Sequence, residues 1–516
     1  MAANKDAFVQ LVKNGYTFKG ENFRIGTAVL NGEVLAGSDI FLPLKTMNRH
    51  GLIAGATGTG KTKTLQVMAE GLSDASVPVL MMDIKGDLSG IAAAGTENDK
   101  IKERLSKIGG GYKPSAFPVE LMTLSDQKGV RMRATVSEFG PILISKILGL
   151  NDTQEGLVAM IFKYCDDNKM PLLDLKDFVK VLQYVSNEGK AEIEKEYGKI
   201  ATTSTGTVLR KVVELQQQGA DIFFGEPSFE VDDLMKIADD GRGMINILRV
   251  TDMQNRPKLF STFMLQLLAE LYATLPEAGD IDKPKLILFI DEAHLVFQEA
   301  TEALLQQIET VIKLIRSKGV GIFFCTQNPQ DVPASVLAQL GLKVQHALRA
   351  FTAADRKTIK EAAQNYPETE YYDVDELLTQ LGIGEAFITM LNEKGIPTPL
   401  VHTMLVPPGS RMDILSDSEI DALVSKSKLV SKYAEAVDEK SAYEILTDKL
   451  NDAADKQKQE EDQKEDNKKS SQEKGFFDNP VVKQVGRTAA SVITRSLLGA
   501  LGLGGRSSSR KKSGWL

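Results

Sequence analysis

The residues with the clearest chemical role form one short glycine-rich run. Its sequence is Gly55-Ala56-Thr57-Gly58-Thr59-Gly60-Lys61-Thr62, which fits the pattern G-x-x-x-x-G-K-[ST]. Glycines allow several backbone amides to face one anion, and the N-terminus of a following helix adds positive potential. Lys61 is expected to neutralise the β- and γ-phosphates of a nucleotide, and the Thr62 hydroxyl to bind Mg²⁺. The run therefore predicts an ATP-phosphate site, with Thr64 in the next helix as a further contact.

Two acids follow an apolar run much further along the chain. Asp291 and Glu292 come directly after Leu286–Ile290. Such a strand end beside a phosphate-binding loop predicts that Asp291 holds the Mg²⁺ water shell and that Glu292 polarises the attacking water. General-base help of this kind is worth about 10²–10⁴ in rate.

The same acids belong to the tetrapeptide Asp291-Glu292-Ala293-His294, which also occurs in a different class of helicases. Those enzymes have two tandem lobes with a Ser-Ala-Thr motif between them, and a second lobe is not evident here. We therefore interpret His294 as a local hydrogen-bonding or packing residue.

Further polar residues stand at the ends of other apolar runs. Gln327 follows Val320–Cys325 and is expected to sense the γ-phosphate or position water. Arg316 precedes that run, and it is either an arginine finger that reaches a neighbouring subunit's nucleotide or an ordinary surface charge. The position of Arg316 favours the finger, whereas for Arg349, at the end of the next expected strand, the surface charge is favoured. Asp83, Lys85 and Asp87 follow another apolar run, where a turn role and a role in the site are equally open.

The elements that must position these residues indicate an α/β fold. Apolar runs of strand length recur from His50 onward with helical stretches between several of them, which is typical of a mostly parallel sheet buried on both faces. Residues 137–219 contain only helical patterns and are expected to be an inserted all-helical subdomain. Glu385–Met390 and Leu400–Leu405 are expected to pair antiparallel, and Asn31-Gly32 predicts a hairpin near the N-terminus.

These patterns predict seven segments. They are a small N-terminal β element (1–47), the two parts of the core (48–136 and 220–408), the helical insertion (137–219), C-terminal helices (409–450), a charged linker (451–475) and an apolar and basic tail (476–516). The tail could lie on an anionic membrane surface, dock on a protein, or remain disordered.

The complete set of motifs resembles the HerA/FtsK superfamily of RecA-like P-loop ATPases, and within it the bacterial HerA-like proteins. The residues that carry the resemblance are Asn48–Thr62, Asp83–Asp87, Ile290–His294, Arg316–Gly319 and Thr326-Gln327. The resemblance implies a hexameric ring that translocates double-stranded DNA and uses ATP and Mg²⁺ as its cofactors. DNA as the substrate comes from the resemblance alone.

Composition limits the other possibilities. The 516 residues exceed what one hydrophobic core usually holds, so more than one domain is expected. The net charge of −8 gives no indication of an overall affinity for nucleic acid. Cys165 and Cys325 lie far apart, as expected for reduced thiols, and no apolar run is long enough for a membrane span, so a cytoplasmic location is expected. Two other functions remain open at this point: a nucleotide-dependent scaffold or assembly ATPase docked through its C-terminal tail, and a motor that translocates protein.

Overall fold

The structure is a computed structural model that describes residues 5–254, 256–297, 302–434 and 440–471. Its residues divide into two compact units, Met1–Leu446 and Thr447–Leu516. The expected tail, 476–516, lies outside the described residues. Among the described residues, none of the helices is long and apolar enough to cross a membrane.

A single 12-stranded sheet organises the first unit, with the order β2-β1-β12-β11-β10-β3-β9-β8-β4-β7-β5-β6. The strands are β1 (Asn22–Leu30), β2 (Glu33–Pro43), β3 (Gly51–Ala54), β4 (Val79–Asp83), β5 (Val119–Thr123), β6 (Val130–Arg131), β7 (Ile245–Arg249), β8 (Leu286–Ile290), β9 (Val320–Thr326), β10 (Leu342–Gln345), β11 (Glu385–Met390) and β12 (Val401–Leu405). The ladders from β10 to β6 are all parallel, and those from β2 to β10 are all antiparallel.

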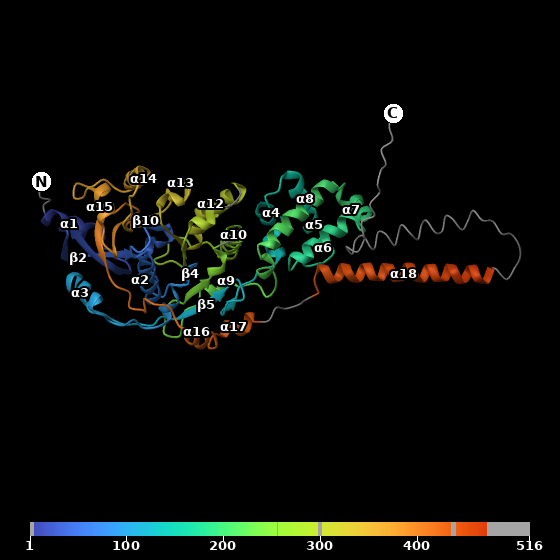
Figure 1. Cartoon of the computed structure of the whole chain (residues 1–516), viewed down its shortest axis with the longest axis horizontal. Helices are drawn as coiled ribbons and strands as arrows, with labels where there is room; N and C mark the ends of the chain where they lie inside the picture. Colours follow the sequence, from blue (N-terminus) through green and yellow to red (C-terminus); the bar gives the residue numbers. More distant parts are fainter. Residues whose placement is uncertain (1–4, 255, 298–301, 435–439, 472–516) are drawn as a thin grey trace, which may run out of the picture. The chain divides into compact units, whose positions relative to one another are not determined.

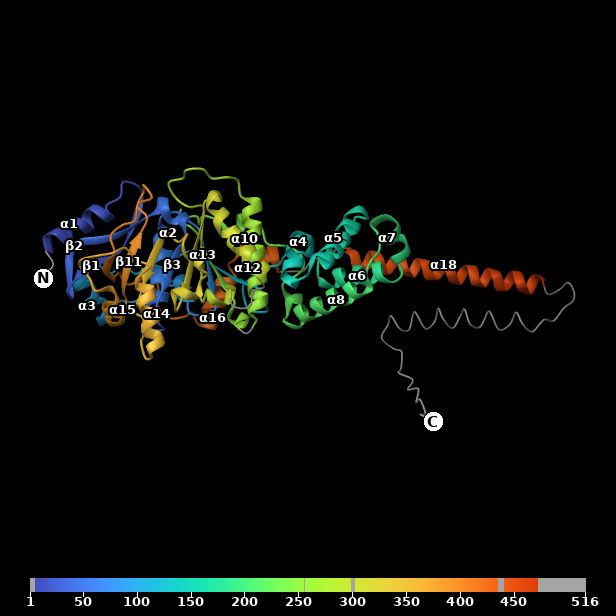
Figure 2. The ribbon, with the colours of Figure 1, turned by 90° about the horizontal axis from the view of Figure 1, so that it is seen from above.

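The helices of the sheet-containing part are α1 (Lys5–Tyr16), α2 (Lys61–Asp74), α3 (Asp99–Ile108), α9 (Val231–Leu234), α10 (Pro257–Thr274), α11 (His294–Phe297), α12 (Glu302–Ile315), α13 (Ala334–Leu337), α14 (Ala353–Ala363), α15 (Val374–Gln380), α16 (Asp417–Val424) and α17 (Lys428–Tyr433). Figure 2 shows β3 and α2 within this part, and α10 and α12 close together. The strands β3, β4, β8 and β9 are buried along their whole length, as a sheet covered on both faces requires. The mostly parallel sheet predicted from the apolar runs is therefore confirmed.

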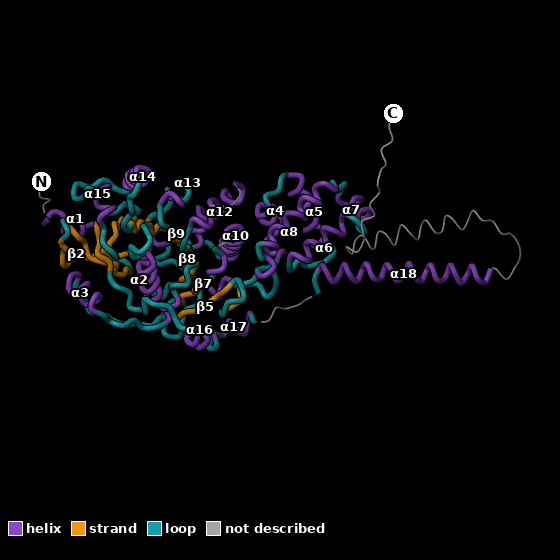
Figure 3. The backbone as a smooth tube through the Cα atoms, in the orientation of Figure 1, coloured by secondary structure: helices purple, strands orange, loops and turns teal. Residues whose placement is uncertain are grey.

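Residues 136–217 contain helices and no strand. They form α4 (Val136–Leu148), α5 (Asp152–Asp167), α6 (Leu175–Ser186), α7 (Lys190–Tyr197) and α8 (Thr202–Gln217), and Figures 1 and 3 show them as a helical cluster. The strands on either side of this segment, β6 and β7, both belong to the central sheet. The last described helix, α18 (Ala442–Ser471), includes most of the mixed-charge run.

The predicted N-terminal hairpin is present, and it extends the central sheet. Asn31 and Gly32 both have positive φ, 52° and 77°, as a tight two-residue hairpin turn requires. β1 pairs with β2 on one side and antiparallel with β12 on the other. The hairpin therefore continues the sheet, and α1, which the sequence analysis did not anticipate, buries Phe8, Val12 and Tyr16 beside it.

Candidate functional site

The glycine-rich run joins a buried strand to a helix. β3 ends at Ala54, α2 begins at Lys61, and Gly55, Gly58 and Gly60 between them have φ values of 154°, 80° and 115°. A Cβ on Gly55 would lie only 2.5 Å from the Cβ of His346, so a side chain there would clash. Gly60 caps α2 in the left-handed region without any side chain over the first-turn amides. Those amides have no intrahelical partner, which makes this helix end suited to an anion.

Lys61 and Thr62 lie at the start of α2. The Lys61 ammonium donates to the carbonyl oxygens of Gly55, at 2.6 Å, and Ala56, at 3.2 Å. Burial lowers the pKa of Lys61, so an anion that replaced water beside it would be strongly favoured. The Thr62 hydroxyl donates to the Asp87 carboxylate at 3.2 Å.

The remaining residues of the loop either support it or form its tip. The Thr59 hydroxyl donates to the Ala56 carbonyl at 2.7 Å, while Thr57 and Gly58 at the tip are exposed. The Thr64 hydroxyl lies 2.9 Å from Nε2 of His346 and 3.3 Å from the Gly60 carbonyl. Thr64 thus braces the loop from within α2.

Both predicted acids lie at the end of β8. Burial raises the pKa of Asp291, and the Lys85 ammonium opposes that rise. Glu292 is also buried, and its φ of 47° is unusual for a residue with a side chain. Such a conformation costs about 1–3 kcal/mol and is found mainly at functional sites. His294 Nδ1 lies 3.2 Å from Oε2 of Glu292, but this oxygen has no hydrogen-bond partner, so the contact is one of proximity.

The sheet order brings the acids and the loop to one edge. β9 lies between β3 and β8, all three strands are parallel, and the Gly55 amide donates to the Thr326 carbonyl at 3.2 Å. Gln327 is the next residue after β9 and is exposed. Gln327 therefore follows the strand that separates the P-loop strand from the strand of the two acids.

The segment after β4 has two different roles. Asp83 is a turn residue, because its carboxylate accepts from the amides of Gly86 at 2.7 Å, Asp87 at 3.1 Å and Leu88 at 3.3 Å. Lys85 reaches the acids, with Nζ at 2.5 Å from Oε1 of Glu292 and 3.6 Å from Oδ2 of Asp291. Asp87 contacts Thr62, so the segment joins the P-loop to the acids.

His346 was not anticipated from the sequence. It follows β10, is fully buried, and its amide donates to the Ala54 carbonyl at 2.7 Å. Burial lowers its pKa to about 4, so the ring is neutral where it packs against the P-loop. A lone histidine in an apolar run carries no sequence signal that it will support a loop almost three hundred residues earlier.

The two candidate arginines lie at different places. Arg316 is exposed and begins a short turn (Arg316–Lys318) before β9, at the opposite end of that strand from Thr326. Arg349 was expected at the end of a strand, but β10 ends at Gln345 because the next residues leave the sheet to support the P-loop. Arg349 is exposed and lines a groove of about 700 Å³ with Phe351 and Arg356.

An apolar hollow of about 230 Å³ adjoins the P-loop helix. Its lining includes Gly60, Thr64 and Val67 on one side and Ile101, Ile383 and Pro407 on the other. Arg104 fixes this wall, because its guanidinium donates to the carbonyls of Gly384 at 3.0 Å and Leu405 at 3.2 Å. The hollow offers an apolar surface beside an anion site, which is what a nucleotide base requires.

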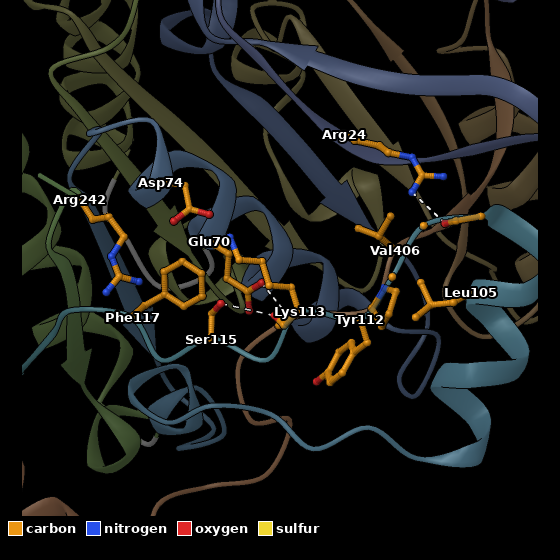
Figure 4. Close-up of a pocket in the computed structure, with 15 residues that line it drawn as sticks. Arg24, Glu70, Asp74, Leu105, Tyr112, Lys113, Ser115, Phe117, Arg242 and Val406 are labelled. Atoms are coloured by element: carbon orange, nitrogen blue, oxygen red, sulfur yellow. Dashed lines mark hydrogen bonds between the residues drawn. The ribbon is translucent and has the colours of Figure 1, made fainter. Parts of the chain in front are cut away.

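A separate hollow of about 440 Å³ lies near the other end of α2, and Figure 4 shows the residues that line it. Its buried acid Glu70 already accepts from the amides of Gly409 at 2.8 Å and Ser410 at 3.0 Å. Arg24, also in the hollow, donates to the Gly109 carbonyl at 3.3 Å. This hollow contains none of the predicted site residues.

Comparison with known proteins gives one family match over most of the chain. The family described as "Helicase HerA-like C-terminal" matches residues 29–508. Two relatives are named DNA double-strand break repair helicase HerA. That of Sulfurisphaera tokodaii is 23% identical over 69% of this chain and 65% of its own length. That of Sulfolobus acidocaldarius is 22% identical over 71% of this chain and 67% of its own length. The chain thus spans slightly less than two thirds of the first relative.

Among solved structures, plasmid coupling protein TrwB in complex with an ATP analogue is similar at 14% identity. The similarity covers 77% of this chain and 99% of that one, with a TM-score of 0.49.

Proposed function

The chain belongs to the family of helicase HerA-like C-terminal proteins and is a P-loop ATPase. We propose that it works as a hexameric ring motor that moves double-stranded DNA. The geometry that supports a ring is the position of Arg316, at the far end of β9 from its own P-loop. A neighbouring copy can bring that arginine to the nucleotide. DNA as the moved polymer rests on the names of the relatives.

The P-loop supports the proposed binding of the nucleotide phosphates. The first-turn amides of α2 and the Lys61 ammonium supply the positive charge, and the apolar hollow beside Gly60 and Thr64 accommodates the base. We propose that the complete run Gly55–Thr62 contacts the phosphates and that Thr64 holds the loop in shape.

The oxygen atoms near Thr62 fit a magnesium ion. Mg²⁺ prefers oxygen ligands and usually takes one or two carboxylates together with waters and phosphates. The Thr62 hydroxyl and the Asp291 carboxylate supply such oxygens. Asp87 accepts from Thr62 through Oδ2, and its other oxygen, the buried Oδ1, has no hydrogen-bond partner. We propose Thr62 and Asp291 as the residues that hold the ion, which when bound would offset negative charge on the phosphates.

Glu292 and Gln327 are the proposed residues for the attacking water. Glu292 is held at the end of β8 in a fixed backbone conformation, and its carboxylate accepts the proton as the water attacks. Gln327 orients the water or senses the terminal phosphate from the end of the neighbouring strand.

We expect Glu292→Gln to bind ATP but to lower kcat about 10²–10⁴-fold, since the amide retains the shape of the carboxylate without its basicity. Single-turnover hydrolysis and equilibrium binding of ATP separate the two effects. Glu376→Gln, on the exposed surface of α15, is the matched control and should hydrolyse ATP like the unchanged chain. Rapid turnover by Glu292→Gln would place the base elsewhere.

The DNA proposal is tested by the ATPase rate of the complete chain with different polymers. We expect double-stranded DNA to raise the rate and longer duplexes to raise it further, because a translocating ring turns over repeatedly along its track. Stimulation by a polypeptide but not by DNA would instead favour a motor that moves protein. No response to either polymer would favour the scaffold, which hydrolyses ATP only as a switch.

The division of the chain supports the proposed organisation of such a motor. We propose that 48–136 and 220–408 form the ATPase core and that 137–219 is an inserted helical subdomain, since strands of one sheet flank it. The chain carries two free, buried cysteines, which fits a cytoplasmic location.

A further inference from the structure

Lys85 forms the closest ion pair in the candidate site. Its ammonium lies 2.5 Å from Oε1 of Glu292 and 3.6 Å from Oδ2 of Asp291. Both acids are buried, whereas the Lys85 side chain is 34% exposed. Lys85 can therefore move toward the open side of the site, while the acids remain within the fold.

The segment that carries Lys85 has a fixed backbone. The Asp83 carboxylate holds the amides of Gly86 and Asp87, and Gly86 has the φ of 77° that this turn requires. Two residues beyond Lys85, Asp87 accepts from the Thr62 hydroxyl. The backbone of Lys85 is thus held in place between the P-loop and the acids.

The phosphate site lies within the range of the Lys85 charge. Asp87, two residues beyond Lys85, accepts from the Thr62 hydroxyl at 3.2 Å, and Lys61 precedes Thr62 at the start of α2. The ammonium groups of Lys61 and Lys85 thus stand on adjoining segments of one site, and both would gain from a polyanion between them. The terminal phosphate of ATP supplies that charge, and ADP does not.

The pairing with Lys85 also restrains Glu292. The Lys85 ammonium, at 2.5 Å, engages Oε1 of Glu292, whereas Oε2 has no hydrogen-bond partner. The ion pair therefore fixes the direction of the carboxylate, and Glu292 can turn toward an attacking water when Lys85 leaves Oε1.

We propose that Lys85 is a γ-phosphate sensor that holds Glu292 in the nucleotide-free chain and moves to the terminal phosphate when ATP binds, which frees Glu292. The proposal rests on the proposed function, in that it takes Glu292 as the base. It explains why the segment from Asp83 to Asp87 contacts both the P-loop and the acids. The carboxylate then becomes free to turn only when a third phosphate is present.

The decisive experiment compares a non-hydrolysable ATP analogue with ADP, both with Mg²⁺, by equilibrium titration of the complete chain. We expect Lys85→Met to weaken binding of the analogue about tenfold or more while ADP affinity changes less than about twofold, because one charge-assisted hydrogen bond is lost with the analogue alone. Lys85→Arg should restore part of the preference for the analogue. The matched control is Lys283→Met, which removes a lysine that donates to the Ala75 carbonyl at 3.0 Å, just beyond the far end of α2.

A double-mutant cycle tests the transfer itself. Glu292→Gln removes the charge that competes for Lys85, so it should tighten binding of the analogue, and this gain should vanish when Lys85→Met is also present. For ADP the two substitutions should act independently. Coupling that is equal for the analogue and ADP would overturn the proposal, since it would mean that Lys85 only neutralises the buried acids.

Loss of folding is monitored separately by thermal unfolding of each variant. If Lys85→Met weakens the analogue and ADP equally, Lys85 has a structural role and the sensor proposal fails. Rapid hydrolysis by Glu292→Gln would contradict the proposed base, and the comparison of the analogue with ADP would still decide whether Lys85 senses the phosphate.

Discussion

Lys61→Ala should abolish ATP hydrolysis, with a loss of about 10³-fold or more. The ammonium is the only side-chain cation in the P-loop run, and it stabilises negative charge that develops on the phosphates during transfer. The carbonyls of Gly55 and Ala56 accept from the Lys61 ammonium, so it is positioned inside the loop. Steady-state release of phosphate at saturating ATP measures the loss.

The control for this variant is Lys283→Ala. Lys283 donates to the Ala75 carbonyl, just beyond the C-terminal end of the same helix and away from the phosphates, so its removal should leave hydrolysis unchanged. Thermal unfolding of both variants separates loss of chemistry from loss of the fold. Substantial turnover by folded Lys61→Ala would show that the phosphate site has been misplaced.

Arg316→Ala should lower kcat about 10³–10⁵-fold and leave nucleotide affinity nearly unchanged. β9 has seven residues between Arg316's turn and the P-loop edge, a span of about 20 Å, so the arginine cannot reach the nucleotide of its own chain. It can act only across an interface between copies. Single-turnover hydrolysis at a concentration where the chain is assembled measures the effect.

Mixing two inactive variants gives the sharper test of this arginine. A 1:1 mixture of Arg316→Ala and Lys61→Ala should regain activity, because about a quarter of random head-to-tail interfaces combine an intact P-loop with an intact arginine. Lys313→Ala, one turn earlier on α12 and also exposed, is the matched control and should retain full activity. Normal hydrolysis by Arg316→Ala would make Arg349 the better candidate or remove the finger altogether.

Much of the fold and the core of the candidate site were predictable from the sequence. The P-loop is a contiguous run whose chemistry depends on the order of its own residues, so Gly55–Thr62 could be recognised before any fold was known. The strand before Asp291 is a continuous apolar run, and such runs are recognisable because parallel strands are buried on both faces. Local sequence alone therefore indicated the parallel sheet, the helical segment and the two acids.

The edges of the sheet were harder to predict because their patterns are weaker. β5, Val119–Thr123, has only five residues and no regular alternation of apolar and polar positions, and its place in the sheet depends on pairing with β7. The N-terminal hairpin joins the sheet only through β12, nearly four hundred residues later. A local sequence pattern contains no information about contacts between residues so far apart in the chain.

The tertiary structure alone decided which polar residues meet. Lys85 and Glu292 are more than two hundred residues apart, and they form an ion pair because β4 and β8 are neighbours in the sheet. β10 pairs with β3 on the side away from β9, so His346, which follows β10, contacts and supports the P-loop. Arg316 lies far from its own nucleotide site because it stands at the opposite end of β9 from Thr326. Strand order and strand direction determine these distances, and both arise from the packing of the complete chain, whereas a phosphate-binding loop arises from eight consecutive residues.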